Sequence, residues 1–298
     1  MSHAQQETPR YYVPESSPWP LVGGIGLFIT ALGGATFIQE STARYAKEGS
    51  MGAILLTIGL GIIFFMMFGW WRDTVRESLA NLNSNQLSTS YRQGMMWFIT
   101  SEVMFFAAFF GALFYARMLI MPWLGGDGNN TMTHAVLWPD FIPQWPLLTT
   151  PAGETTATIS PWGLPLINTM LLLTSSVTVT IAHHAVIEEN RSKLIWGLAG
   201  TVALGTMFLC VQVYEYIHLY RDVGLTLGSG IYGSTFFMLT GFHGLHVTIG
   251  TIMLFVMLIR SIKGHFTKDN HFAFEATAWY WHFVDVVWLG LFIFVYIL

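Results

Sequence analysis

Seven long apolar stretches run through the sequence, and short polar segments separate them. A hydrocarbon core of about 30 Å requires about 20 consecutive apolar residues in an α-helix. Each stretch has roughly this length, and none contains more than one or two ionisable residues. The pattern therefore predicts an all-α membrane protein with seven transmembrane helices, at 18–39, 51–71, 94–116, 163–182, 195–219, 231–259 and 277–298.

The first stretch is predicted to stay in the protein as a helix, because it lacks the short apolar core and small-residue cleavage site of a signal peptide. We therefore expect a cytoplasmic N-terminal segment at 1–17, two helices within 18–72, and a five-helix bundle within 92–298. An external loop at 117–162 belongs to the bundle. Its prolines and tryptophans predict an ordered flap on the membrane surface, without long regular elements.

Lysine and arginine are unequally distributed between the connecting segments, and this bias predicts the orientation. Nine lie on the side of the N-terminus: Arg10, Arg72, Arg76, Arg92, Arg191, Lys193, Arg260, Lys263 and Lys268. Four lie on the other side: Arg44, Lys47, Arg117 and Arg221. Positive residues are enriched on the cytoplasmic side, so we expect a cytoplasmic N-terminus and, after seven crossings, an external C-terminus.

The amino-acid composition excludes several classes of function. Hydrophobic residues make up 53% of the chain and charged residues 10%, which fits a protein surrounded by lipid. A net charge of −4 argues against a nucleic-acid partner. The single cysteine, Cys210, excludes an internal disulfide and a multi-thiolate metal site.

The first two stretches carry small residues every four positions. These residues are Gly26, Thr30 and Gly34 in one stretch and Ala53, Thr57 and Gly61 in the other. Such spacing allows two helix backbones to approach closely, which predicts a two-helix hairpin. The alternative is that glycine is simply common in membrane helices.

Ionisable residues inside a membrane are energetically costly, so each calls for an explanation. We identify Glu102, Glu215, His243, His246, His282 and Asp285. Glu102 is either a proton-linked or lipid-contact group or a hydrogen-bonded strut between helices. Glu215, His243, His282 and Asp285 are interpreted as buried structural groups that bond across helices.

A metal site is the competing interpretation of the histidines. His183 with His184, His243 with His246, and His282 would be the ligands. Adjacent residues in a helix point about 100° apart, so His183 and His184 are poorly arranged to share one ion. We therefore predict no catalytic residue and no metal site in this chain.

Several motifs, in chain order, closely resemble subunit III of the haem–copper cytochrome c oxidases. They are WWRD at 70–73, SEV at 101–103, LINT at 166–169, AHH at 182–184, YGSTFF at 232–237, GFHGLHV at 241–247 and WYWHFVDVVW at 279–288. The resemblance implies a non-catalytic subunit with no haem or copper of its own. These cofactors are expected in partner subunits of a complex that couples oxygen reduction in aerobic respiration to proton pumping.

The resemblance also implies a specific arrangement of helices and lipid. The first two helices are expected to lean away from the other five and leave a V-shaped cleft filled with phospholipid. Residues that match the family's lipid contacts are Trp71, Glu102, His246 and Arg260. Expected partners are subunit I in direct contact, subunit II and other subunits, with cytochrome c as the electron donor to the complex.

A role in proton uptake follows from the expected place beside subunit I. His3, Glu7, His183, His184 and His271 form a candidate proton-collecting surface on the cytoplasmic side. The absence of an arginine-rich leader favours a bacterial inner membrane over import into an organelle, although an organelle-encoded chain would also lack one.

Two alternatives to this function stay open. The first alternative is subunit III of a quinol-oxidising haem–copper oxidase. The second is a membrane metalloenzyme that uses the histidine pairs. The related quinol oxidases have a shorter subunit without the first two helices, so Trp71 and Arg72 favour the cytochrome c branch. A retinal protein is disfavoured because 277–298 contains no lysine.

Overall fold

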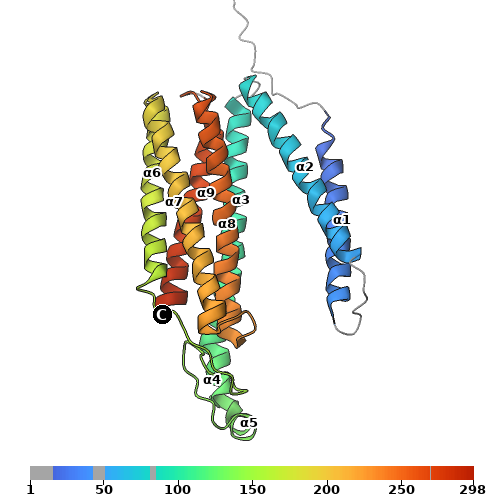
Figure 1. Ribbon diagram of the computed structural model, residues 1–298, viewed down its shortest axis with the longest axis vertical. Coiled ribbons are helices and arrows are strands. Elements are labelled where there is room, and N and C mark those ends of the chain that lie inside the picture. The colour runs from blue at the N-terminus through green and yellow to red at the C-terminus, as the bar shows by residue number, and fades with distance from the viewer. Residues whose placement is uncertain (1–15, 43–50, 81–84, 269) are drawn as a thin grey trace, which may run out of the picture. The chain divides into compact units, whose positions relative to one another are not determined.

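The computed structural model describes residues 16–42, 51–80, 85–268 and 270–298 (Figure 1). These residues form helices, connecting loops and one isolated bridge between Thr149 and Thr155. Among them, seven helices are long and apolar enough to cross a membrane, which confirms the predicted all-α, seven-helix class. The chain divides into two compact units, Met1–Tyr91 and Arg92–Leu298, and each is described by itself.

The first unit contains the packed pair α1 (Trp19–Ser41) and α2 (Met51–Leu79). Glycines make close contact between the two backbones: a Cβ atom added at Gly33 would lie 2.3 Å from the amide nitrogen of Leu56. One added at Gly52 would lie at the same distance from the amide nitrogen of Phe37. Near the start of α1, the Trp19 indole donates a hydrogen bond of 2.9 Å to Asp73.

The small-residue motif identified the hairpin but not all of its contacts. A Cβ atom at Gly34 or Gly61 would meet nothing within 4 Å, so the prediction that these glycines lie in the interface was wrong. Because a helix turns about 100° per residue, Gly33 lies about 20° from the face of Gly26, whereas Gly34 lies about 80° from it. A seven-residue spacing therefore describes this interface better than repeated steps of four.

The second unit is a bundle of five long helices (Figure 1). These are α3 (Asn85–Tyr115, which enters from the first unit), α6 (Leu164–Ile187), α7 (Arg191–His218), α8 (Gly230–Ile262) and α9 (Phe272–Leu291). The helix α9 is the most buried of the spans and continues through the π-helical segment η4 (Phe292–Ile297). The helix α7 continues similarly through η3 (Leu219–Val223). The side chains of Trp281 and Trp288 are buried at the centre of the bundle.

Several helices extend beyond the predicted apolar stretches. The helix α2 runs to Leu79 rather than residue 71, α3 starts at Asn85 rather than residue 94, and α9 starts at Phe272 rather than residue 277. Hydropathy detects only the part of a helix that is apolar, whereas the backbone hydrogen bonds continue into polar sequence. An ion pair of 2.9 Å between Arg92 and Glu275 ties the polar ends of α3 and α9 together.

The connection between α3 and α6 contains short elements, as its prolines predicted. After α3 come η1 (Ala116–Ile120), α4 (Met121–Leu124), η2 (Gly128–Asn130) and α5 (Thr131–Leu137), and the chain then runs without long helices to residue 163. The imidazole of His134 in α5 contacts the carbonyl oxygen of Leu124 at 2.9 Å. The segment is therefore locally ordered. We call this end of the bundle the loop end, and the opposite end the Arg260 end.

The adjacent glycines 33 and 34 provide a test of the α1–α2 contact. We expect Gly33→Ala to destabilise the first unit by about 1–3 kcal/mol, because the new methyl group overlaps the backbone of α2. Gly34→Ala is the matched control and adds its methyl group to open space. Thermal unfolding of the two variants in detergent, followed by circular dichroism, measures the difference. Equal unfolding temperatures would contradict the close contact.

Candidate functional site

Glu102 and His246 form a pair between α3 and α8. The Glu102 carboxylate lies 2.9 Å from Nε2 of His246, and Nδ1 of His246 lies 2.7 Å from the carbonyl oxygen of Phe242. A carbonyl oxygen only accepts hydrogen bonds, so Nδ1 carries a proton. One further proton is therefore shared between the carboxyl group and Nε2, either as a neutral pair or as an ion pair.

Aromatic rings surround this pair. The imidazole of His246 lies 5.0 Å from the ring of Phe106 and 6.4 Å from the ring of Tyr280, measured between centroids. Phe283 also contacts it. Low polarity strengthens a hydrogen bond between two groups and raises the cost of separating them. The geometry therefore makes the pair a strong link between α3 and α8, while its exchange of protons remains a prediction.

Arg260 lies in the last turn of α8 and is buried. Its guanidinium carbon is 4.7 Å from the ring centroid of Phe266, and its Nε atom has no hydrogen-bond partner among the residues that the structure describes. Burial, followed by the charges of Arg260 and Lys263, lowers the pKa of the neighbouring His265. Arg260 thus presents a buried cation that an anion can complement. Trp71 is half-exposed on α2, in the other unit.

A second polar group lies near the loop end of the bundle core. Glu215 is completely buried and accepts a hydrogen bond of 2.7 Å from the Tyr296 hydroxyl. Beside it in α7, Gln212 accepts a bond of 3.1 Å from Asn168. These bonds connect α7 to α6 and to the end of α9. Sequence analysis identified Glu215 but missed its uncharged partners, although asparagine and glutamine within apolar stretches are a usable signal.

His243 and His246 diverge although they are three residues apart in α8. The imidazole of His243 is completely buried and lies 3.0 Å from the carbonyl oxygen of Val284 in α9, whereas His246 faces Glu102 in α3. Within the described residues, no group of three or more histidine, cysteine, aspartate or glutamate side chains is arranged to hold a metal ion. The contacts of His243 and His246 are therefore links between helices.

His282 and Asp285 lie where α9 meets α6. Asp285 is buried, but His282 is partly exposed rather than buried, and its Nδ1 atom lies 2.8 Å from the hydroxyl of Ser176. Sequence analysis did not identify Ser176, because serine is tolerated in membrane helices and gives little signal.

Three of the predicted proton-collecting residues lie at the Arg260 end. The imidazole of His183 is 6.4 Å from that of His184 and 5.9 Å from that of His271, between centroids. His184 is exposed, and the other two are partly exposed. The predicted residues His3 and Glu7 lie outside the described residues.

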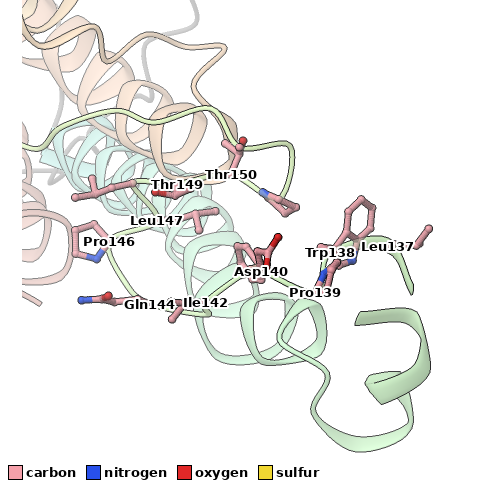
Figure 2. A pocket seen from close by; sticks show the side chains of 14 residues that line it. Leu137, Trp138, Pro139, Asp140, Ile142, Gln144, Pro146, Leu147, Thr149 and Thr150 are labelled. Carbon is pink, nitrogen blue, oxygen red and sulfur yellow. The ribbon is translucent and has the colours of Figure 1, made fainter. Parts of the chain in front are cut away.

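The chain also has two hollows near the loop end. A pocket of about 530 Å³ is formed within the loop segment itself, from Leu137 to Gly153 (Figure 2). Its lining is mainly proline, leucine and threonine, with Asp140 as the charged group. An apolar groove of about 560 Å³ lies between α3 and the end of α9, beside Arg117. Neither lining contains a histidine, a lysine or a cysteine, so neither resembles a catalytic centre.

Comparison with known proteins gives one consistent answer. The family model described as cytochrome c oxidase subunit III matches residues 9–298. A relative named cytochrome c oxidase subunit 3 from Formosania lacustris is 42% identical over 96% of this chain and 96% of its own length. Relatives of that name from Marchantia polymorpha and Arabidopsis thaliana are 40% identical over 96% of this chain and 95% of theirs. The chain therefore belongs to the cytochrome c oxidase subunit III family, the non-catalytic subunit of an oxidoreductase complex.

Proposed function

We propose that this subunit binds structural phospholipid, stabilises the catalytic subunit I and supports proton uptake during the reduction of oxygen to water. The observation that carries the lipid proposal is the buried guanidinium of Arg260, which has no carboxylate partner among the described residues. A buried charge without a partner is costly, and a phosphate oxygen is the anion that a membrane supplies at the end of a transmembrane helix.

The remaining predicted lipid contacts fit a lipid whose headgroup is near Arg260. Glu102 and His246 lie deeper in the bundle, beside the rings of Phe105 and Phe106, where an acyl chain would meet apolar surface. Trp71 is an exposed indole near an arginine, Arg72, which suits the headgroup zone. The lipid-filled cleft between the two units remains a prediction from the family resemblance.

The proposed partners follow from the family. Subunit I would contact this chain directly and hold haem and copper, subunit II would complete the catalytic core, and cytochrome c would supply electrons. Because subunit III of this family is the non-catalytic subunit, we assign the redox chemistry to those partners. If the complex oxidised a quinol instead, reduced cytochrome c would not support its oxygen consumption.

Arg260 provides the test of lipid binding. We expect Arg260→Ala to remove about one phospholipid per complex after a detergent wash, because the phosphate loses its charged hydrogen-bond donor. Lys263→Ala is the matched control, since Lys263 is an exposed cation one turn away. Lipid mass spectrometry of the purified complexes gives the stoichiometry. Unchanged lipid content in Arg260→Ala would contradict the proposal.

We also propose a bacterial inner membrane, with the N-terminus in the cytoplasm and the C-terminus in the periplasm. Arg92, Arg191 and Lys193 all lie at the Arg260 end, which supports a cytoplasmic position for that end. A cysteine placed at exposed Lys193 should react in intact cells only with a membrane-permeant maleimide. A cysteine at exposed Val136 in the loop segment should also react with an impermeant one. The reverse pattern would invert the topology.

Removal of the whole subunit tests its role in turnover. The haem spectrum and the initial rate with reduced cytochrome c should stay close to those of the intact complex, because the redox centres lie elsewhere. In the complex without this subunit, proton uptake should slow at alkaline pH. Free protons are scarce there, and the surface histidines that would collect them have been removed. Activity should also decay faster during sustained turnover.

Oxygen consumption followed to exhaustion across a range of pH, for intact and stripped complexes, measures these effects. Complete loss of activity at every pH would mean that the chain supplies catalytic groups. Identical rates and decay curves would limit its role to assembly.

A further inference from the structure

A polar patch lies on the outer side of the bundle, where α6 and α9 meet. We call it the Asp285 patch, and its members are Ser176, Thr180, His282 and Asp285. Asp285 lies about 20 Å along the span that starts at Phe272, and Ser176 lies about 18 Å along α6. A hydrocarbon core is about 30 Å thick, so the patch lies near the middle of the membrane.

The hydrogen bonds within the patch leave few donors for the carboxyl group of Asp285. The Thr180 hydroxyl donates to the carbonyl oxygen of Ser176 at 2.8 Å, so its 3.4 Å contact with Nε2 of His282 is made by a proton on that nitrogen. Nδ1 of His282 lies 2.8 Å from the hydroxyl of Ser176, and which of the two atoms donates depends on the tautomer of the ring.

Asp285 is a buried carboxyl group with unused hydrogen-bond acceptor positions. The residue is 5% exposed, and neither of its side-chain oxygens has a hydrogen-bond partner among the described residues. The nearest cationic candidate is Nδ1 of His282, which lies at 3.8 Å from one oxygen. Leaving a buried carboxyl group unpaired costs free energy, so a further donor is needed from outside the bundle.

The exposure of His282 points to the direction from which that donor comes. Its side chain is 40% exposed, against 22% for Glu102 and 10% for His246, and the neighbouring Val286 is also exposed. Ionisable side chains at this depth rarely face lipid. Phospholipid headgroups do not reach mid-membrane, and acyl chains form no hydrogen bonds. A protein surface is the cover that satisfies both the exposed imidazole and the unpaired carboxyl group.

We propose that the Asp285 patch is the docking site for a transmembrane helix of another subunit of the oxidase. That helix is apolar apart from a hydroxyl, amide or amine group at mid-membrane, which donates a hydrogen bond to Asp285. This inference rests on the proposed assembly with the oxidase. It adds the surface of this chain that makes the contact and the chemistry of the partner.

Photocrosslinking in the assembled complex tests the docking site without altering the patch. A benzophenone amino acid replaces Val286, whose side chain is 67% exposed beside His282. Irradiation of native membranes should join this position covalently to a transmembrane segment of another subunit, identified by mass spectrometry. A crosslink to lipid alone, or to a second copy of this chain, overturns the proposal. Loss of copurification with the oxidase in the unaltered protein would instead overturn the proposed function.

Substitution of Asp285 tests the predicted hydrogen bond. Asp285→Leu should increase the rate at which the subunit is lost during a detergent wash by about tenfold, whereas Asp285→Asn keeps an acceptor oxygen and should lose less. Thr174→Val is the matched control, because this exposed hydroxyl on α6 already bonds to the carbonyl oxygen of Met170. Equal retention of Asp285→Leu and the control, with the crosslink from position 286 preserved, shows that Asp285 does not make the contact.

Discussion

The absence of water inside a membrane is the constraint on which the bundle depends. A polar side chain in the hydrocarbon region must find its partner within the protein, and most of those partners lie on α9 or face it. The Trp281 indole donates to Ser175, the Trp288 indole donates to Thr169, and the Tyr296 hydroxyl donates to Glu215. These bonds make α9 the central element that holds α6 and α7.

The two units solve the packing problem by different means. In the first unit, glycines bring the backbones of α1 and α2 together, and the contact relies on shape and van der Waals attraction. In the second unit, large aromatic rings fill the core and polar groups fix the relative rotation of the helices. Phe208, for example, packs edge-on against Trp288 at 4.8 Å between centroids. The α1–α2 pair thus combines close backbone contact with a few hydrogen bonds near its ends, whereas the bundle of five helices has many directional bonds in its core.

The polar groups also differ in how completely the chain satisfies them. Glu102 is paired with His246, and one carboxylate oxygen of Glu215 is paired with Tyr296, while the other oxygen of Glu215 has no partner among the described residues. Arg260 and Asp285 keep unpaired atoms, one near the end of its helix and the other at mid-membrane. In our proposals a phospholipid completes Arg260 and a second protein completes Asp285, whereas the bonds of Glu102 and Glu215 hold helices of the bundle together.

The sequence by itself determined the number of helices, the membrane class and the family, because long apolar stretches and ordered motifs are local signals. It also indicated the ionisable residues that matter, since charge in an apolar stretch is conspicuous. Only the tertiary structure decided which hydrogen-bond partner each of these residues has. The sequence of α8 gave no indication that His243 would bond to Val284 while His246 bonds to Glu102. Once a helix is packed on two sides, side chains three residues apart contact different neighbours. The sequence also gave no indication of Ser176 or Tyr296, because each bonds to a residue that is distant in the chain. Which glycines touch, and which carboxyl oxygens stay unpaired, depends on the rotation and packing of the helices, which no local pattern records.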